Sequence, residues 1–441
     1  MISDLGGTAW TLATFLVAIV IIVTVHEFGH YIVGRWTGIH AEVFSLGFGK
    51  VIWSRVDKRG TRWQVAALPL GGYVKFMGDA DGSSRPDQGA MVGLSAEEKR
   101  HTMHGAPLWA RSATVIAGPL ANFILAFVLF FGVILSKGVA VDQPLIGLLR
   151  DVPFSTPSLQ VGDLVTSVDG QPTPDLAAFF TVADELSDEG SVSYQVTRAG
   201  KTLTVAGPNP LPPVVDSVQP QSAAIDAGLE AGDVIVKAGG QDIASFSQLP
   251  LLVEATSGKQ MDLTVWRAGK TFDVTLTPRR RDIPTADGGF ETRWLLGITG
   301  GVLFDPVTRA PSVTEAAVTA WKQGFYMVKT NLSGLGYMIV GKISSCNMSS
   351  PIGIAKVVGA AARSGWETFL QTVALVSLSI GLLNLFPIPV LDGGHLVFHV
   401  WEATTGHPPS ARVLQVLMTL GLGLLLGLMV FAVSNDLFRC S

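Results

Sequence analysis

His26-Glu27-Phe28-Gly29-His30 lies inside an apolar run, from about residue 9 to residue 36, that carries no charge before Glu27. The run is long enough to cross a bilayer as a helix, which takes roughly 20 residues. Residues four apart lie on the same face of a helix, so His26 and His30 can both point at one metal ion. Glu27 is adjacent to the first of these ligands, where it can take a proton from a metal-bound water.

A purely structural explanation of this stretch is also open, in which two packed core histidines lie beside an isolated carboxylate. Ionisable side chains are costly in the hydrocarbon of a bilayer, so those that occur there are functional candidates by default. Three of them at the HExxH spacing favour a metal site. The sequence therefore predicts a metal ion bound within the first apolar segment, with Glu27 as the general base.

The composition is that of a membrane protein with a substantial soluble part. Of the 441 residues, 48% are hydrophobic and only 15% are charged. The formal net charge of −4 argues against a nucleic-acid-binding protein. The two cysteines lie far apart in the sequence and indicate neither a disulfide framework nor a Cys-based zinc site. The N-terminal MISDLGGTAW carries no Lys or Arg, so we expect a retained span rather than a secretory signal peptide.

Four apolar segments predict four membrane-spanning helices, at about residues 9–34, 113–135, 369–386 and 413–433. The Lys- and Arg-rich stretch at 35–107 belongs on the cytoplasmic side by the positive-inside rule. The N-terminus and the residues after the second segment are then expected outside. A helical pattern at 312–342 contains lysines and is interpreted as an amphipathic helix on the outer membrane surface.

Two apolar runs between the first two spans, residues 40–56 and 62–76, are predicted strands. Both are too apolar for a solvated hairpin, so we expect a sheet that dips into the membrane beside the metal. An ordinary cytoplasmic hairpin is the alternative. The third span ends in NLFPIPVLDGGH, residues 384–395, where two prolines and two glycines predict a broken helix. Such breaks are tolerated at membrane depth where they line a cavity or lie buried in protein.

A catalytic zinc ion needs three protein ligands and one open position, so a third ligand must come from elsewhere in the chain. Asp392, His395, His399 and several loop histidines are the candidates. Asp392 ranks first because it lies at the break of a span, at roughly the depth expected for the HExxH histidines.

The central part of the chain holds an internal repeat. LQVGDLVTSVDGQ at 159–171 matches LEAGDVIVKAGGQ at 229–241, and VTRAGKTLTV at 196–205 matches VWRAGKTFDV at 265–274. The offset is close to 70 residues in both comparisons, so a module is duplicated. Each copy predicts the order strand, strand, helix, strand, strand, and resembles PDZ domains of the bacterial periplasmic type. Modules that act as spacers without a ligand are the alternative.

The whole arrangement, in order along the chain, resembles the site-2 proteases, and more narrowly the RseP type of bacterial intramembrane protease. The resemblance rests on HEFGH in the first span, paired PDZ-like modules after the second, and NLFPIPVLDGGH in the third. It implies Zn²⁺ held by His26, His30 and Asp392. It also implies that Asn384 holds the substrate backbone.

The resemblance further implies that FSLGFG at 44–49, with Gly47 and Gly49, and ALPLGGYVKF at 67–76 are membrane-associated strands that receive an extended substrate. The expected fold is a polytopic α-helical membrane protein with about four spans, this sheet and two extracytoplasmic PDZ-like α+β domains. The expected location is the bacterial inner membrane, with the N-terminus and the PDZ-like domains on the periplasmic side.

These expectations divide the chain into eight segments. They are the first span with HExxH (1–36), the cytoplasmic-side strands and loop (37–107), the second span (108–137), the two PDZ-like domains (138–208 and 209–282), an extracytoplasmic linker with the amphipathic helix (283–366), the third span (367–411), and the fourth span with the tail (412–441).

The function implied is that of an intramembrane zinc endopeptidase in regulated intramembrane proteolysis. By resemblance its partners are the lipid bilayer and single-span membrane proteins, such as an anti-sigma factor of envelope stress signalling after a first extracytoplasmic cut, and remnants of signal peptides. A catalytically silent PDZ membrane scaffold or chaperone is the alternative, and a metal transporter is a third hypothesis. The intact set of His26, Glu27, His30 and Asp392 disfavours the scaffold.

Overall fold

The computed structural model of the chain describes residues 2–80, 89, 93–154, 158–186, 190–285 and 289–439. The chain forms two compact units. The first, the membrane unit, comprises residues 1–133, 317–332 and 349–437. The second, the repeat unit, comprises residues 134–316, 333–348 and 438–441.

Apolar helices dominate the membrane unit. They are α1 (Ile2–Trp36), α3 (Leu108–Lys137), α8 (Pro351–Arg363), α9 (Trp366–Asn384), α10 (Asp392–Thr405) and α11 (Ala411–Ser434), with a short α2 (Ala96–Arg100). Among the described residues, four stretches are long and apolar enough to cross a membrane: Gly6–Trp36, Leu108–Lys137, Trp366–Asn384 and Ala411–Phe438. The prediction of about four spans, near these positions, is therefore confirmed by length and composition.

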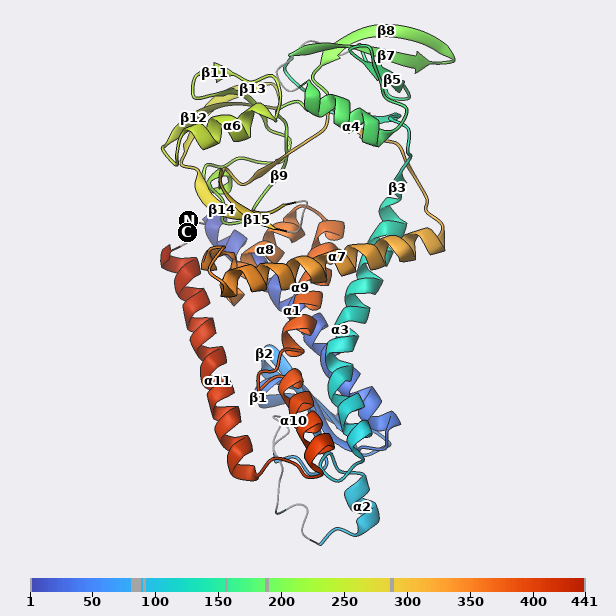
Figure 1. The fold of residues 1–441 in the computed structure, drawn as a ribbon, viewed down its shortest axis with the longest axis vertical. Coiled ribbons are helices and arrows are strands. Elements are labelled where there is room, and N and C mark those ends of the chain that lie inside the picture. Colours follow the sequence, from blue (N-terminus) through green and yellow to red (C-terminus); the bar gives the residue numbers. More distant parts are fainter. Residues whose placement is uncertain are drawn as a thin grey trace. The chain divides into compact units, whose positions relative to one another are not determined.

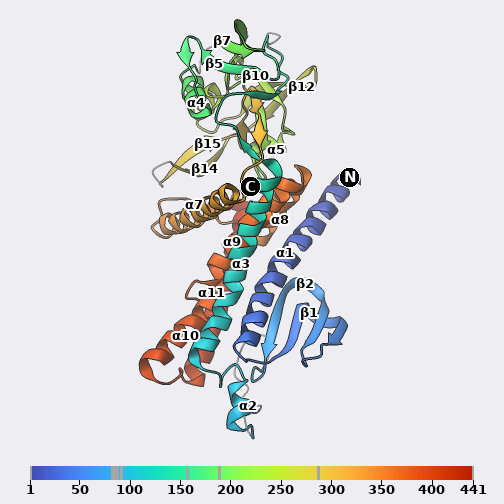
Figure 2. The same ribbon diagram turned by 90° about the vertical axis from the view of Figure 1, so that its right-hand side faces the viewer.

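Helices α1 and α3 cross (Figures 1 and 2), and glycines allow them to come close together there. A Cβ atom added at Gly29 would lie 2.4 Å from the carbonyl oxygen of Ala117, and one added at Gly118 would lie 2.2 Å from His30 Nε2. Small residues let membrane helices pack backbone to backbone. Gly29 is the fourth residue of HEFGH, so the motif itself fits this close crossing.

The two predicted strands are present as β1 (Ala41–Val56) and β2 (Arg62–Phe76). Both strands bend, so each contributes two extended segments, called arms, to the sheet. Ser45 is partnered by Tyr73 on one side and by Gln64 on the other, and the outer arm 51–56 pairs with 62–66. The bend in β1 contains Gly47 and Gly49, whose φ angles of +89° and +86° favour glycine.

The outer arm of β1 carries apolar side chains that pack against little of the protein. Ile52 is 72% exposed and Trp53 is 54% exposed. Exposed apolar side chains in such a run are typical of a surface that contacts lipid or another chain.

The third span is broken as predicted. Helix α9 ends at Asn384 and α10 begins at Asp392. A Cβ atom added at Gly393 would lie 2.3 Å from the carbonyl oxygens of Leu385 and Phe386, and one at Gly394 would lie equally close to the carbonyl of Ile388. The connecting loop therefore folds tightly onto the start of α10, which is possible only because two glycines follow Asp392.

The repeat unit contains the duplicated module as two four-stranded sheets of the same topology. Their strand orders are β6-β5-β7-β8 and β11-β10-β12-β13, and each module has a helix between its second and third strands in sequence. The strands are β5 (Leu164–Val168), β6 (Gln171–Pro172), β7 (Ser191–Arg198), β8 (Lys201–Pro208), β10 (Val234–Ala238), β11 (Gln241–Asp242), β12 (Met261–Arg267) and β13 (Lys270–Leu276), and the helices are α4 (Leu176–Glu185), α5 (Ala223–Asp226) and α6 (Gln248–Ala255).

Both copies also retain the same buried ion pair. Arg198 donates to both carboxylate oxygens of Asp163, at 2.7 and 2.6 Å, and Arg267 does the same to Asp233, at 2.5 and 2.8 Å. Each aspartate is fully buried. The bonds from Arg198 hold the pKa of Asp163 below its usual value. The repeat seen in the sequence is therefore a repeat of structure as well.

A segment from the expected linker completes both modules. Residues 298–309, called the return segment, contain β16 (Ile298–Gly300), β17 (Phe304–Pro306) and β18 (Thr308–Arg309). These strands pair in turn with β9 (Val215–Val218) in the second module, β4 (Ile146–Leu149) beside the first, and β3 (Val139–Ala140). A hairpin of β14 (Arg279–Pro284) and β15 (Phe290–Leu295) precedes the return segment.

The predicted amphipathic helix is α7 (Val313–Ile339), which is not among the candidate spans found in the described part of the chain. Ser312 and Glu315 form a capping box at its start. Its exposed apolar side chains include Trp321 and Phe325. Beyond α7, Cys346 is disulfide-bonded, a bond that the wide spacing of the cysteines in the sequence did not indicate.

Candidate metal centre

Three side chains from two helices converge in the membrane unit. His26 and His30 lie one turn apart on α1, and their Nε2 atoms are 3.1 Å apart. Asp392, the first residue of α10, places Oδ2 3.2 Å from His26 Nε2 and Oδ1 3.5 Å from His30 Nε2. Within the described residues this is the only group of three or more His, Cys, Asp or Glu side chains that is arranged to hold a metal ion.

The donor atoms fit a single zinc ion. Zinc binds histidine nitrogen at about 2.0–2.1 Å and carboxylate oxygen at about 2.0–2.2 Å, so donors at tetrahedral angles lie roughly 3.3–3.5 Å apart. The three separations of 3.1, 3.2 and 3.5 Å are close to this range. Two imidazoles and one carboxylate are also a donor set that catalytic zinc uses, with a fourth position left for water.

Helix α3 supports both histidines from behind. His30 Nδ1 lies 2.8 Å from the carbonyl oxygen of Thr114, and His26 Nδ1 lies 3.2 Å from the side-chain nitrogen of Asn122. A carbonyl oxygen only accepts, so the His30 ring donates from Nδ1, and the neutral ring that binds a metal then presents its lone pair on Nε2. The sequence offered no sign of Thr114, which acts through its backbone. A polar Asn122 within a span was the only signal for the second contact.

Glu27 lies beside the three donors without being one of them. It is within electrostatic range of His26, His30 and Asp392, and it is hydrogen-bonded to the backbone of Val74 in β2. A Cβ atom added at Gly72 would lie 3.2 Å from Glu27 Cγ. The last part of β2 therefore runs directly past the Glu27 side chain.

The structure brings together His26, Glu27, His30 and Asp392, as the sequence predicts. It places the other three candidate residues elsewhere in the membrane unit. Asn384 is the last residue of α9, and its half-buried side chain makes no hydrogen bond to a described residue. Gly47 and Gly49 lie in the bend of β1, where a Cβ atom at Gly47 would be 2.7 Å from the carbonyl of Leu68. Their role in substrate binding stays a prediction.

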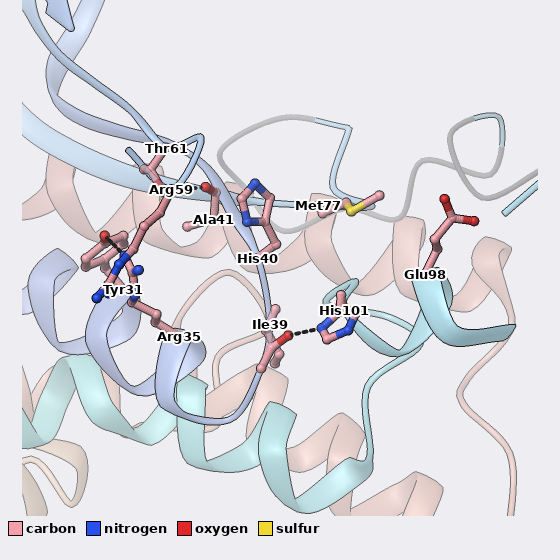
Figure 3. A pocket seen from close by; sticks show the side chains of 11 residues that line it. Tyr31, Arg35, Ile39, His40, Ala41, Arg59, Thr61, Met77, Glu98 and His101 are labelled. Carbon is pink, nitrogen blue, oxygen red and sulfur yellow. Dashed lines mark hydrogen bonds between the residues drawn. The ribbon is translucent and has the colours of Figure 1, made fainter. Parts of the chain in front are cut away.

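The alternative ligands lie outside the three-residue group. His395 and His399 follow Asp392 on α10, and His399 Nδ1 is 3.0 Å from Ser112 Oγ. A separate cavity of about 330 Å³ is lined by Tyr31, Arg35, His40, Arg59 and His101, among others. Figure 3 shows Arg35 and Arg59 beside Tyr31 at one end of this cavity and Glu98 at the other. None of the three donors lines it.

An HExxH helix and a carboxylate at the break of a second apolar helix together define a metal-dependent hydrolase built into membrane-spanning helices. The chain belongs to peptidase family M50, whose family model matches residues 14–428.

Curated relatives align with nearly the whole chain. The protein is 35% identical over 462 residues to the regulator of sigma-E protease RseP of Escherichia coli, covering 98% of this chain and 99% of that protein. It is 33% identical over 427 residues to "Putative zinc metalloprotease Atu1380" of Agrobacterium fabrum, covering 96% and 94%. It is 33% identical to the regulator of sigma E protease of Salmonella typhimurium, over 98% of this chain and 99% of that protein.

Proposed function

We propose that the chain is an intramembrane endopeptidase that cleaves the membrane-spanning segment of single-span membrane proteins. The observation that carries this proposal is the convergence of His26, His30 and Asp392, with Glu27 beside them, on helices long and apolar enough to span a bilayer. A non-catalytic scaffold does not require a carboxylate beside three metal donors.

The chain is a zinc metalloprotease, as its membership of peptidase family M50 and the names of its relatives indicate. In our proposal the ligands are His26, His30 and Asp392. When bound, zinc supplies a nucleophilic water near neutral pH and polarises the scissile carbonyl. Glu27 takes a proton from the attacking water and later delivers it to the leaving amide nitrogen.

The sheet beside Glu27 suits the presentation of an unwound substrate. A substrate helix keeps its carbonyls in internal hydrogen bonds, so it must unwind before attack, and its freed backbone groups need partners in the membrane. Addition of an extended strand to a sheet edge supplies such partners. In this proposal the β1–β2 sheet is membrane-associated, and Asn384, Gly47 and Gly49 contact the substrate backbone.

We further propose an inner-membrane location in which the N-terminus and the repeat unit face the periplasm. The Lys- and Arg-rich residues 35–107 support this orientation. The disulfide at Cys346 supports it as well, because disulfides persist in oxidising compartments such as the periplasm.

Labelling of single cysteines in intact cells tests the orientation. We expect Lys201→Cys, on the exposed β8 of the first module, to react with a membrane-impermeant maleimide, whereas Lys58→Cys, in the exposed turn between β1 and β2, reacts only after the cells are permeabilised. Cys346 contributes no background because it is disulfide-bonded. Labelling of Lys58→Cys in intact cells, with Lys201→Cys protected, would invert the proposed topology.

The substrate class is proposed from the resemblance to the RseP-type proteases. Two relatives carry the name regulator of sigma-E protease, and we propose an anti-sigma factor, already cut outside the membrane, as the substrate. We propose that the two modules, residues 138–208 and 209–282, are PDZ-like domains that exclude uncut substrates by size or bind a newly exposed carboxyl end. The four-stranded sheets with their helices support this assignment.

Removal of the metal tests the proposed activity directly. We expect a chelator to abolish cleavage of a single-span test substrate by the detergent-solubilised protein, and one equivalent of Zn²⁺ to restore it, because the donor set fits zinc. Mg²⁺ is the control and should restore nothing, since it prefers six oxygen ligands. Undiminished cleavage by protein shown to be free of metal would refute a metal-dependent mechanism.

A further inference from the structure

One buried amide beside the metal centre has an unsatisfied oxygen. Asn122 on α3 is fully buried, and its Nδ2 faces His26 Nδ1 at 3.2 Å. Its Oδ1 has no hydrogen-bond partner and is one of two such buried side-chain atoms in the described part of the chain. Leaving a buried polar atom unpaired costs about 1–3 kcal/mol, so the unpaired Oδ1 of Asn122 needs a physical explanation.

The role of His26 decides which end of the amide must face it. His26 Nε2 points toward His30 Nε2 and Asp392, so as a metal ligand it must offer a lone pair there. A neutral imidazole then carries its single hydrogen on Nδ1. An amide nitrogen cannot accept that hydrogen, whereas the amide oxygen can. A half-turn of the side chain exchanges the two ends with little change of shape.

The arrangement at the other histidine supports the same orientation. Thr114, Gly118 and Asn122 are spaced by four residues and lie on one face of α3. Thr114 gives its carbonyl oxygen to His30 Nδ1, and Gly118 leaves room for the His30 ring. Asn122 reaches His26 one turn further along. The Nδ1 atom of each histidine therefore lies next to a group on α3 that has an oxygen: the Thr114 carbonyl for His30 and the Asn122 amide for His26.

Asn122 is also held in place from its other side. Ser377 on α9 donates its hydroxyl to the backbone carbonyl of Asn122 at 3.0 Å. A Cβ atom added at Gly381 would lie 3.0 Å from Asn122 Cβ. Packing between α3 and α9 therefore fixes where the amide sits and leaves it little freedom except the exchange of its ends.

We propose that Asn122 is a positioning residue of the metal centre, whose side-chain oxygen accepts the Nδ1 hydrogen of His26 and so holds Nε2 ready for the metal. The proposal rests on the metal-ligand role of His26 in the proposed function. Acceptors that bind the outer nitrogen of a ligating histidine fix its tautomer, and their loss typically lowers metal affinity about 10–100-fold.

Zinc affinity of two variants tests the orientation of the amide. Asn122→Leu has a similar size but no acceptor, so we expect it to bind Zn²⁺ about 10–100-fold more weakly in competition with a chromogenic chelator. Asn122→Asp keeps an acceptor and loses the donor, so we expect an affinity within a few-fold of the wild type. Asn331→Leu is the matched control, because Asn331 bonds Ser379 instead of the metal ligands.

The outcomes separate this inference from the function on which it rests. If both Asn122 variants bind Zn²⁺ as the wild type does, the positioning role is wrong. If both are equally weakened, the nitrogen end faces His26 and the proposed orientation is wrong. Thermal unfolding of the metal-free proteins shows whether Asn122→Leu folds, and if it does not, Asn122→Ala, which also removes the acceptor, takes its place in the comparison. A wild type that binds no zinc would overturn the proposed function itself.

Discussion

Replacing Glu27 with Gln should leave the zinc content unchanged and lower the rate of substrate cleavage by about 10²–10⁴-fold, the usual contribution of a general base. Glu27 is not one of the three donors, so the metal should stay bound. The amide has nearly the same shape and still accepts the hydrogen bond from the backbone of Val74, but it cannot take a proton. Zinc analysis and cleavage of a single-span substrate in detergent, on the same preparations, measure both quantities.

The control for Glu27→Gln is Glu97→Gln, which changes an exposed carboxylate on α2. It should cleave at the wild-type rate. Cleavage by Glu27→Gln at the same rate as Glu97→Gln would remove Glu27 from the role of base. Loss of zinc from Glu27→Gln would instead indicate that the carboxylate binds the metal, contrary to its position beside the donor group.

The second large effect is expected at Asp392. Asp392→Ala removes the one carboxylate among the three donors. The two imidazoles that remain are one ligand short of the three that a catalytic zinc ion needs. We expect the affinity for Zn²⁺ to fall by more than about 100-fold, since even loss of a group that only hydrogen-bonds a metal ligand costs about 10–100-fold. Equilibrium competition with a chelator measures the change, and cleavage should fall with it.

His395→Ala is the comparison for this second prediction. His395 is the first histidine after Asp392 on α10 and is an alternative third ligand. We expect it to keep zinc close to the wild-type level. The reverse result, with zinc retained by Asp392→Ala and lost from His395→Ala, would assign the third ligand to His395.

Local rules were enough to predict the elements that bear the metal ligands. The pairing of His26 with His30 follows from the helical repeat alone, and the break that exposes Asp392 follows from two prolines and two glycines within a few residues. The four spans follow from length and hydrophobicity. Each of these features is fixed by neighbours in the sequence, so no knowledge of the tertiary fold was needed.

The features that sequence reasoning missed depend on contacts between distant segments. Thr114 supports His30 through a backbone carbonyl, which no residue type reveals. The contact of Asn122 with His26 depends on how α1 crosses α3. The return segment forms strands of two or three residues, which are too short to show a periodic pattern and exist only because their partners lie more than 80 residues earlier, as Thr299 pairs with Ser217.

The close packing of glycine against backbone around the metal centre has a consequence for how such enzymes diverge. There is no room for a side chain between Gly118 and His30, nor between the two glycines after Asp392 and the loop 385–389. A side chain at any of these glycines would collide with a metal donor or with backbone, so we expect these positions to stay glycine while lineages separate. In the proposed function the substrate meets the β1–β2 sheet and the two modules, so we expect substrate preference to change through the side chains exposed there.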